Sequence, residues 1–162
     1  HIDLAKAVWL DYCECKMIDT IAREPLWRHL INYRCGTGHS VSFVGNVHEG
    51  PHALNSRNTT RMRPGMVVTD EPGVYETDLV GIRIENELVC IHKADNQYGT
   101  FLGFEPLTFV PIATSPILPG VLDKDELAWL NDYHRQVFAK LAPHLNAEER
   151  VWLAEKCASI GC

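Results

Sequence analysis

The sequence has 162 residues, of which 46% are hydrophobic and 22% are charged, and its formal net charge at pH 7 is −6. This is the balance of an ordinary globular domain with enough chain to bury a sizeable core. The acidic net charge argues against a nucleic-acid-binding protein, and no apolar run reaches the roughly 20 residues of a membrane-spanning helix.

The first part of the chain predicts two helices. One covers residues 1–12, where apolar residues fall near helical spacing at Ile2, Ala5, Val8 and Trp9. The other covers residues 17–33, with Pro25 marking a kink. Because the first residue is His1 rather than Met and no signal peptide is visible, we expect a processed, trimmed or partial chain.

The cysteines show no regular disulfide framework; they stand at positions 13, 15, 35, 90, 157 and 162. We interpret them as reduced thiols of a cytoplasmic protein. Cys13 and Cys15 form a C-x-C pair with no second pair downstream, which favours cysteines at a helix end over a zinc site.

The composition of the middle of the chain predicts loops and strands. Residues 35–51 are rich in glycine and histidine, and residues 55–64 are polar and rich in turn formers. Strands are predicted over 66–69, 81–92 and 107–112, with a turn region at 98–103.

A proline- and glycine-containing segment then leads into a helical tail. One helix is predicted from Asp123 to about Leu141. Asn146 and Glu149 have the spacing of a capping box at the start of another helix, which runs to about Ile160. Helices followed by strands and then by helices indicate the α+β class.

Two histidines in the glycine-rich segment are candidates for metal ligands or catalysis. His39 follows Gly36-Thr-Gly, and His48 lies in Asn46-Val-His-Glu-Gly-Pro51. Glycine lets backbone come close to a buried site. Structural histidines remain the alternative for each residue taken alone.

Two glutamates follow at strand positions. Glu71 comes after the 66–69 strand and before a Pro-Gly turn, where it can face a cleft. In the 81–92 strand, alternation puts Arg83, Glu85 and Glu87 on one face. Glu85 could point at a metal with Arg83 in support, or the face could simply be solvated. Imidazole with carboxylates suits Mn²⁺, Fe²⁺, Co²⁺ or Zn²⁺.

Four motifs occur in a fixed order along the chain: Gly36-Thr-Gly-His39, Asn46-Val-His-Glu-Gly-Pro51, Pro64-Gly-Met-Val-Val-Thr-Asp-Glu71-Pro-Gly-Val-Tyr75, and Gly81-Ile-Arg-Ile-Glu85-Asn. Together they resemble the motif series of aminopeptidase P, a pita-bread metallopeptidase. Residues 18–27 resemble the family helix before the first motif. Residues 104–108 and 129–134 resemble the C-terminal segment of its long, three-domain branch, so the resemblance covers nearly the whole chain.

The resemblance implies a part of the pita-bread fold, with a curved, mostly antiparallel sheet flanked by helices. Residues 1–122 would form the C-terminal part of the catalytic domain, and 123–162 a helical tail packed on it. The implied activity is hydrolysis of the N-terminal Xaa-Pro bond of peptides with proline at the second position. Two divalent ions are implied, with Mn²⁺ expected and Zn²⁺ or Co²⁺ as alternatives. The resemblance also implies a cytoplasmic homodimer without nucleic-acid or membrane partners.

The resemblance also assigns roles to individual residues. His39 and Glu71 match metal ligands, and Glu85 matches the carboxylate that bridges two ions. His48 matches a histidine near the substrate carbonyl, and Arg83 matches a residue that supports the bridging glutamate. We therefore expect the donor atoms of His39, Glu71 and Glu85 to lie within roughly 5 Å of a common point.

Three departures from the family pattern stand out. Two of the five family ligands are aspartates that would precede His1, so we expect this chain alone to bind metal weakly and to be inactive. Cys35 stands where the family has a histidine. Ser40 and Ser42 replace the glycines of Gly-Val-Gly after the ligand histidine.

Two other kinds of function remain open. One is a non-catalytic pita-bread module that binds peptides or proteins. The other is a different hydrolase of this fold, either a prolidase or a metal-free creatinase-like enzyme. Residues 129–134 favour aminopeptidase P over prolidase, and the pair Glu71 and Glu85 disfavours the metal-free enzyme.

Overall fold

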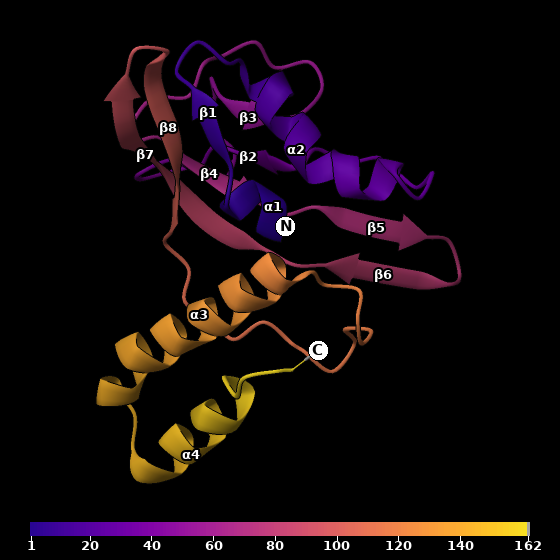
Figure 1. Cartoon of the computed structure of the whole chain (residues 1–162), viewed down its shortest axis with the longest axis vertical. Coiled ribbons are helices and arrows are strands. Elements are labelled where there is room, and N and C mark those ends of the chain that lie inside the picture. The colour runs from indigo at the N-terminus through magenta and orange to yellow at the C-terminus, as the bar shows by residue number, and fades with distance from the viewer. Residues whose placement is uncertain (162) are drawn as a thin grey trace. The chain divides into compact units, whose positions relative to one another are not determined.

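The largest sheet is antiparallel, with four strands in the order β1-β8-β7-β4 (Figure 1). The computed structural model describes residues 1–161. The strand bounds are Val8–Leu10 for β1, Val67–Asp70 for β4, Asn86–Asn96 for β7 and Gly99–Pro106 for β8. The chain divides into two units: His1 with Asp3–Thr108, and Ile2 with the residues from Phe109 onward.

The first unit also contains two hairpins and two helices. Strand β2 (Gly38–His39) pairs with β3 (Ala53–Leu54), and β5 (Gly73–Glu76) pairs with β6 (Val80–Arg83). The helices are α1 (Ile2–Ala5) and α2 (Cys15–Trp27). A bridge between Ser40 and Val68 joins the end of β2 to β4, so a histidine-bearing segment lies against the central sheet.

The core of the first unit follows from strand alternation. In β7, Leu88 and Cys90 point inward and are fully buried, as alternate residues of a strand with one covered face must be. Trp9 of β1 packs against Phe104 of β8 with ring centroids 4.6 Å apart. Side chains from the helices, hairpins and central strands complete this core, among them Leu4, Ile18, Leu54, Val68 and Leu102.

The second unit is helical, with α3 (Lys124–Leu141), a short 3₁₀ turn η1 (Ala142–His144) and α4 (Ala147–Lys156). Both predicted helix starts are confirmed, and each is a capping box, in which Asp123 pairs with Glu126 and Asn146 with Glu149. Tyr133, Val137, Ala142 and Leu153 form the core. None of the helices in residues 1–161 is long and apolar enough to cross a membrane.

The predictions for the first two helices need correction. The helix predicted over 1–12 ends at Ala5, and Val8–Leu10 is a strand because it finds β8 as a partner. This is tertiary pairing overriding a short helical pattern. The helix predicted over 17–33 begins at Cys15 and ends at Trp27, just after Pro25. Leu30 then has φ 58°, a left-handed conformation that no helix continues.

The predicted strands at 81–92 and 107–112 and the turn at 98–103 are also wrong in detail. The 81–92 segment is interrupted, because Ile84 and Glu85 lie between β6 and β7. Of the predicted turn, Tyr98 lies in a turn, whereas residues 99–103 are part of β8. Residues 107–112 form no strand, since Tyr133 and His134 take their backbone hydrogen bonds: the Tyr133 hydroxyl pairs with Val110, and His134 Nε2 accepts from the Ile112 N–H.

The ends of the second unit differ from expectation as well. Helix α4 stops at Lys156, because Asn131 binds both the N–H and the carbonyl of Ile160 outside any helix. Residues 109–122 group with the helices, whereas the expected boundary lies after 122. The assignment of 1–122 to a catalytic domain stays a prediction.

Five cysteines are free thiols, and Cys162 lies outside the described residues.

We expect the helical unit to lose stability below pH 6.5 because of His134. Its imidazole is fully buried, and burial lowers its pKa from the usual 6.5. The unfolded state therefore takes up the proton first, so the stability contribution is complete above pH 6.5 and falls as the pH drops towards the lower pKa of the folded state. Hydrogen exchange of the α3 amides at pH 7.5 and 5.5 measures this difference.

His134→Gln should weaken that pH dependence. The matched control is His144→Gln, which changes an exposed histidine of the same unit and should leave the pH dependence intact. Equal opening free energies at the two pH values in the wild-type protein would contradict the assignment.

Candidate functional site

The site begins with a close approach between two backbone segments. A Cβ atom added to Gly38 would lie 1.7 Å from the carbonyl oxygen of Thr69, so only glycine allows β2 to lie this close to β4. The N–H of Glu71 donates to the carbonyl of Thr37 at 2.7 Å, which extends the contact between the two backbone segments to the residues beyond Gly38 and Thr69. His39 and Glu71 are thereby placed side by side although they are far apart in the sequence.

Thr69 joins the two side chains through its hydroxyl. The oxygen accepts the backbone N–H of His39 at 2.9 Å, and the hydroxyl donates to Glu71 Oε1, also at 2.9 Å. The same Glu71 oxygen lies 2.9 Å from His39 Nε2. One buried side chain thus holds both the backbone of His39 and the carboxylate of Glu71.

The protonation of His39 follows from its neighbours. Its Nδ1 lies 3.0 Å from the carbonyl oxygen of Ser40, which can only accept, so Nδ1 carries a proton. Nε2 faces Glu71 Oε1, which also accepts, so either a second ring proton or a cation must lie between these two atoms. A histidine whose other ring N–H binds a carbonyl is the usual arrangement of a metal ligand.

Arg83 binds the second carboxylate oxygen of Glu71. Its Nη1 donates to Glu71 Oε2 at 2.6 Å, so the carboxylate, which is 9% exposed, has partners on both oxygens. Burial would lower the pKa of Arg83, but the nearby negative charges, first that of Glu71 and also that of Glu85, raise it. Arg83 therefore stabilises Glu71 directly, whereas the expectation had placed it behind Glu85.

His48 lies next to His39. The two rings meet edge to face, with centroids 3.9 Å apart at an angle of 87°. His48 is exposed to solvent, whereas His39 is half-buried. The structure thus brings together the two histidines of the glycine-rich segment, the outer one free to meet a ligand.

Glu85 does not join this group. Its side chain is exposed, and it follows the end of β6, which pairs with β5, whereas β7 pairs with β4. Residues 1–161 contain no group of three or more His, Cys, Asp or Glu side chains that could hold a metal ion. Of the three expected ligands, the structure brings His39 and Glu71 into contact, whereas Glu85 lies in the break between β6 and β7, and its ligand role stays a prediction.

Sequence reasoning missed Thr69 and Asp70. Thr69 shares a strand face with Glu71, and this spacing of two was the signal that could have identified it. Asp70 is fully buried, and its Oδ2 lies 3.2 Å from His1 Nδ1. Burial raises the pKa of Asp70, although His1 opposes that shift. No sequence pattern links positions 1 and 70.

Comparison with known families gives two adjacent matches. Residues 1–92 match the sequence model of metallopeptidase family M24, and residues 100–160 match that of the C-terminal region of peptidase M24. Over 99% of its length, the chain is 40% identical to the aminopeptidase P1 of Lotus japonicus, of which it covers 25%. It spans about a quarter of the length of such curated relatives.

Two solved structures extend the comparison. An X-prolyl aminopeptidase from Caenorhabditis elegans, described as a cytosolic enzyme with a di-nuclear active site, superposes with a TM-score of 0.91 and 38% identity. That match covers 99% of this chain and 27% of the other. The prolidase from Pyrococcus furiosus gives a TM-score of 0.53 at 28% identity, over 65% of this chain and 28% of that one.

Gly38→Ala should destabilise the first unit strongly. The added methyl would collide with a backbone carbonyl that cannot move away as a flexible side chain could. We expect a loss of unfolding free energy at or above the upper end of the about 1–3 kcal/mol typical of overpacking, measured by urea denaturation.

The matched control for that substitution is Gly36→Ala. A Cβ there meets nothing closer than 3.4 Å, so its cost should be small. Equal midpoints for Gly38→Ala and the wild-type protein would show that the two segments do not depend on their close approach.

Proposed function

This chain belongs to metallopeptidase family M24, and from that premise we propose that the protein containing it is a two-metal Xaa-Pro aminopeptidase. The observation that carries the proposal is the contact of His39 Nε2 with Glu71 Oε1 at 2.9 Å, in a chain that matches an X-prolyl aminopeptidase over 99% of its length. The expected family and the α+β, pita-bread-type fold are confirmed by the same matches.

The donors present fit part of a metal centre. His39 and Glu71 would be ligands, because Nε2 offers a lone pair beside a carboxylate oxygen and Nδ1 is already held by Ser40. Glu85 would be the bridging carboxylate, and two aspartates from the region of the domain before this chain would complete the set. We propose Mn²⁺ as the metal, with Zn²⁺ or Co²⁺ as alternatives. Two bound divalent ions supply a water of lowered pKa and stabilise charge on the carbonyl oxygen.

The remaining residues would prepare the substrate and the ligands. His48 is exposed and lies against His39, so its free ring edge can donate a hydrogen bond to the carbonyl oxygen of a peptide. Arg83 holds Glu71 by Oε2 and leaves Oε1 directed at His39. The ion pair with Arg83 compensates the charge of a carboxylate that is nearly buried.

Coverage favours an aminopeptidase over a prolidase. The prolidase match covers 65% of this chain, whereas the aminopeptidase match covers 99% and therefore includes the helical unit. A non-catalytic binding module is the alternative from another class, and the paired His39 and Glu71 argue against it, because such a module has no need for two potential ligands in contact.

We further propose a cytoplasmic homodimer that acts on peptides with proline in second position. The C. elegans structure is described as a cytosolic enzyme, which supports the location. The tail aromatics give the dimer limited support, because Tyr133 is buried in its own unit and Trp129 stacks on it at 5.4 Å. Trp152 is 54% exposed and could contribute to an interface.

We expect the chain by itself to bind Mn²⁺ weakly and to release no amino acid from a peptide of the Arg-Pro-Pro type. His39 and Glu71 alone leave an ion under-coordinated. Joined to the upstream region of the domain, the chain should bind two ions and become active. Calorimetric titration and an assay for the released residue test this, and tight binding of two ions by the chain alone would contradict it.

In that restored protein, Glu85→Gln should lower kcat by about 100-fold or more, because the amide loses the charge that a bridging ligand needs. Glu87→Gln is the matched control, because it changes a nearby glutamate on β7 in the same way. His48→Ala should lower kcat by about 100-fold with the metals still bound, whereas the exposed His92 can be replaced by Ala without effect. Full activity of Glu85→Gln would rule out its ligand role.

A further inference from the structure

A buried ion pair lies on α2, outside the site described above. Arg23 Nε donates to Asp19 Oδ2 at 2.8 Å, and the two residues are 7% and 1% exposed. Removing two charges from water is costly, and a buried ion pair is often replaceable by apolar side chains without loss of stability. The pair therefore calls for a role other than stabilising the helix.

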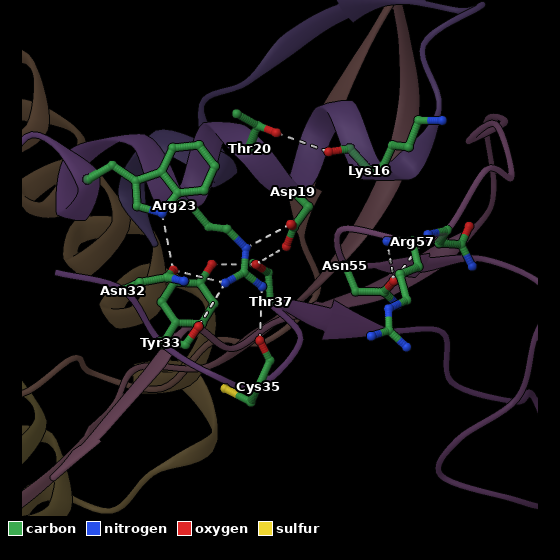
Figure 2. Close-up of polar contacts among 12 residues, drawn as sticks. Lys16, Asp19, Thr20, Arg23, Asn32, Tyr33, Cys35, Thr37, Asn55 and Arg57 are labelled. Atoms are coloured by element: carbon green, nitrogen blue, oxygen red, sulfur yellow. Dashed lines mark hydrogen bonds and ion pairs between the residues drawn. The ribbon is translucent and has the colours of Figure 1, made fainter. Parts of the chain in front are cut away.

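The guanidinium reaches beyond its own helix to the segment that leads into the site (Figure 2). Its Nη1 donates to the carbonyl of Tyr33 at 2.9 Å and to Asn32 Oδ1 at 3.2 Å, and its Nη2 donates to the carbonyl of Cys35 at 2.9 Å. The Tyr33 ring also lies 4.1 Å from the guanidinium carbon. One side chain thus holds residues 32–35 at several points.

The second oxygen of Asp19 continues the contact to Thr37. The Thr37 hydroxyl donates to Asp19 Oδ1, which can only accept, so the Tyr33 hydroxyl must donate to Thr37 Oγ1. Burial raises the pKa of Tyr33 to about 12, so that hydroxyl keeps its proton at neutral pH. The hydroxyl protons of Tyr33 and Thr37 therefore have defined directions, and Thr37 is fully buried.

From Thr37 the contacts lead to both proposed ligands. Its carbonyl accepts the N–H of Glu71 at 2.7 Å, and the next residue is the glycine packed on the Thr69 carbonyl. Thr69 in turn binds the N–H of His39 and Oε1 of Glu71. This path leaves no room for movement, because the backbone of Gly38 already lies against the carbonyl of Thr69.

We propose that the Asp19–Arg23 pair and Thr37 form a positioning network, which sets the separation of His39 and Glu71 for metal binding. This inference rests on the proposed function, since it assigns the network to the same site. Asp19, Arg23 and Thr37 are not among the proposed ligands, and they act through the backbone of residues 36–39. A displacement of Thr37 therefore shifts both ligands, through its hydrogen bond to Glu71 and through Gly38.

The decisive variant is Thr37→Val in the protein with its upstream region restored. Valine keeps the volume of threonine but cannot donate to Asp19, so we expect the affinity for Mn²⁺ to fall by about 10–100-fold, as for other residues that orient metal ligands. The kcat should fall while KM for the peptide changes little. Thr37→Ser keeps the hydroxyl and should restore both metal affinity and kcat.

A second comparison uses two ion pairs on one helix. Arg23→Gln removes the buried pair, and Arg28→Gln removes the exposed pair with Glu24, which has the same spacing of four residues. We expect the first to weaken Mn²⁺ binding, measured by calorimetry, and the second to leave it unchanged. Unfolding midpoints without metal report separately on stability.

The possible outcomes separate the positioning network from the proposed function. If the wild-type protein binds Mn²⁺ and cleaves Xaa-Pro peptides while Thr37→Val does both equally well, the positioning network is wrong and the proposed function stands. A drop in the unfolding midpoint of Thr37→Val without any change in metal affinity or kcat would likewise overturn the network alone. A wild-type protein that neither binds Mn²⁺ nor cleaves these peptides overturns both.

Discussion

The contact of the Gly38 backbone with the Thr69 carbonyl is the constraint on which the site depends. It joins the β2–β3 hairpin to the central sheet, together with the bridge between Ser40 and Val68. Because the contact is between main-chain atoms, the fold sets the backbone positions from which the imidazole of His39 and the carboxylate of Glu71 project. Preorganisation of this kind lets a metal site form without the entropy cost of collecting mobile ligands.

The same solution to buried charge appears twice in the first unit. Glu71 has His39 and Thr69 on one oxygen and Arg83 on the other, and Asp19 has Thr37 on one and Arg23 on the other. Burying a carboxylate is costly unless its oxygens are hydrogen-bonded or paired with a positive charge. In both cases a threonine hydroxyl supplies one hydrogen bond and an arginine the opposite charge, so each carboxylate has a single orientation.

The contact of His39 with Glu71, without a third metal-binding side chain among residues 1–161, agrees with a chain that spans about a quarter of its relatives. His39 and Glu71 are placed by contacts within the first unit, and they meet without help from other parts of a protein. Glu85 lies in a break between strands, and its side chain is exposed. A two-metal centre would need further donors, which is why the proposed activity belongs to the larger protein.

The sequence by itself determined the family, the α+β class and the helix starts at Asp123 and Asn146, because ordered motifs and capping boxes are local patterns. It also singled out His39, His48 and Glu71. Only the tertiary structure decided that Val8–Leu10 is a strand, since that depends on pairing with β8.

The same holds for the break at Glu85 and for the partners of each charge. Arg83 is two residues from Glu85 in the sequence but binds Glu71. Arg23 of α2 holds the loop before His39. Such contacts join segments far apart in the chain. No periodicity or motif encodes them, because they arise only when the packed backbone brings donors and acceptors within hydrogen-bonding distance.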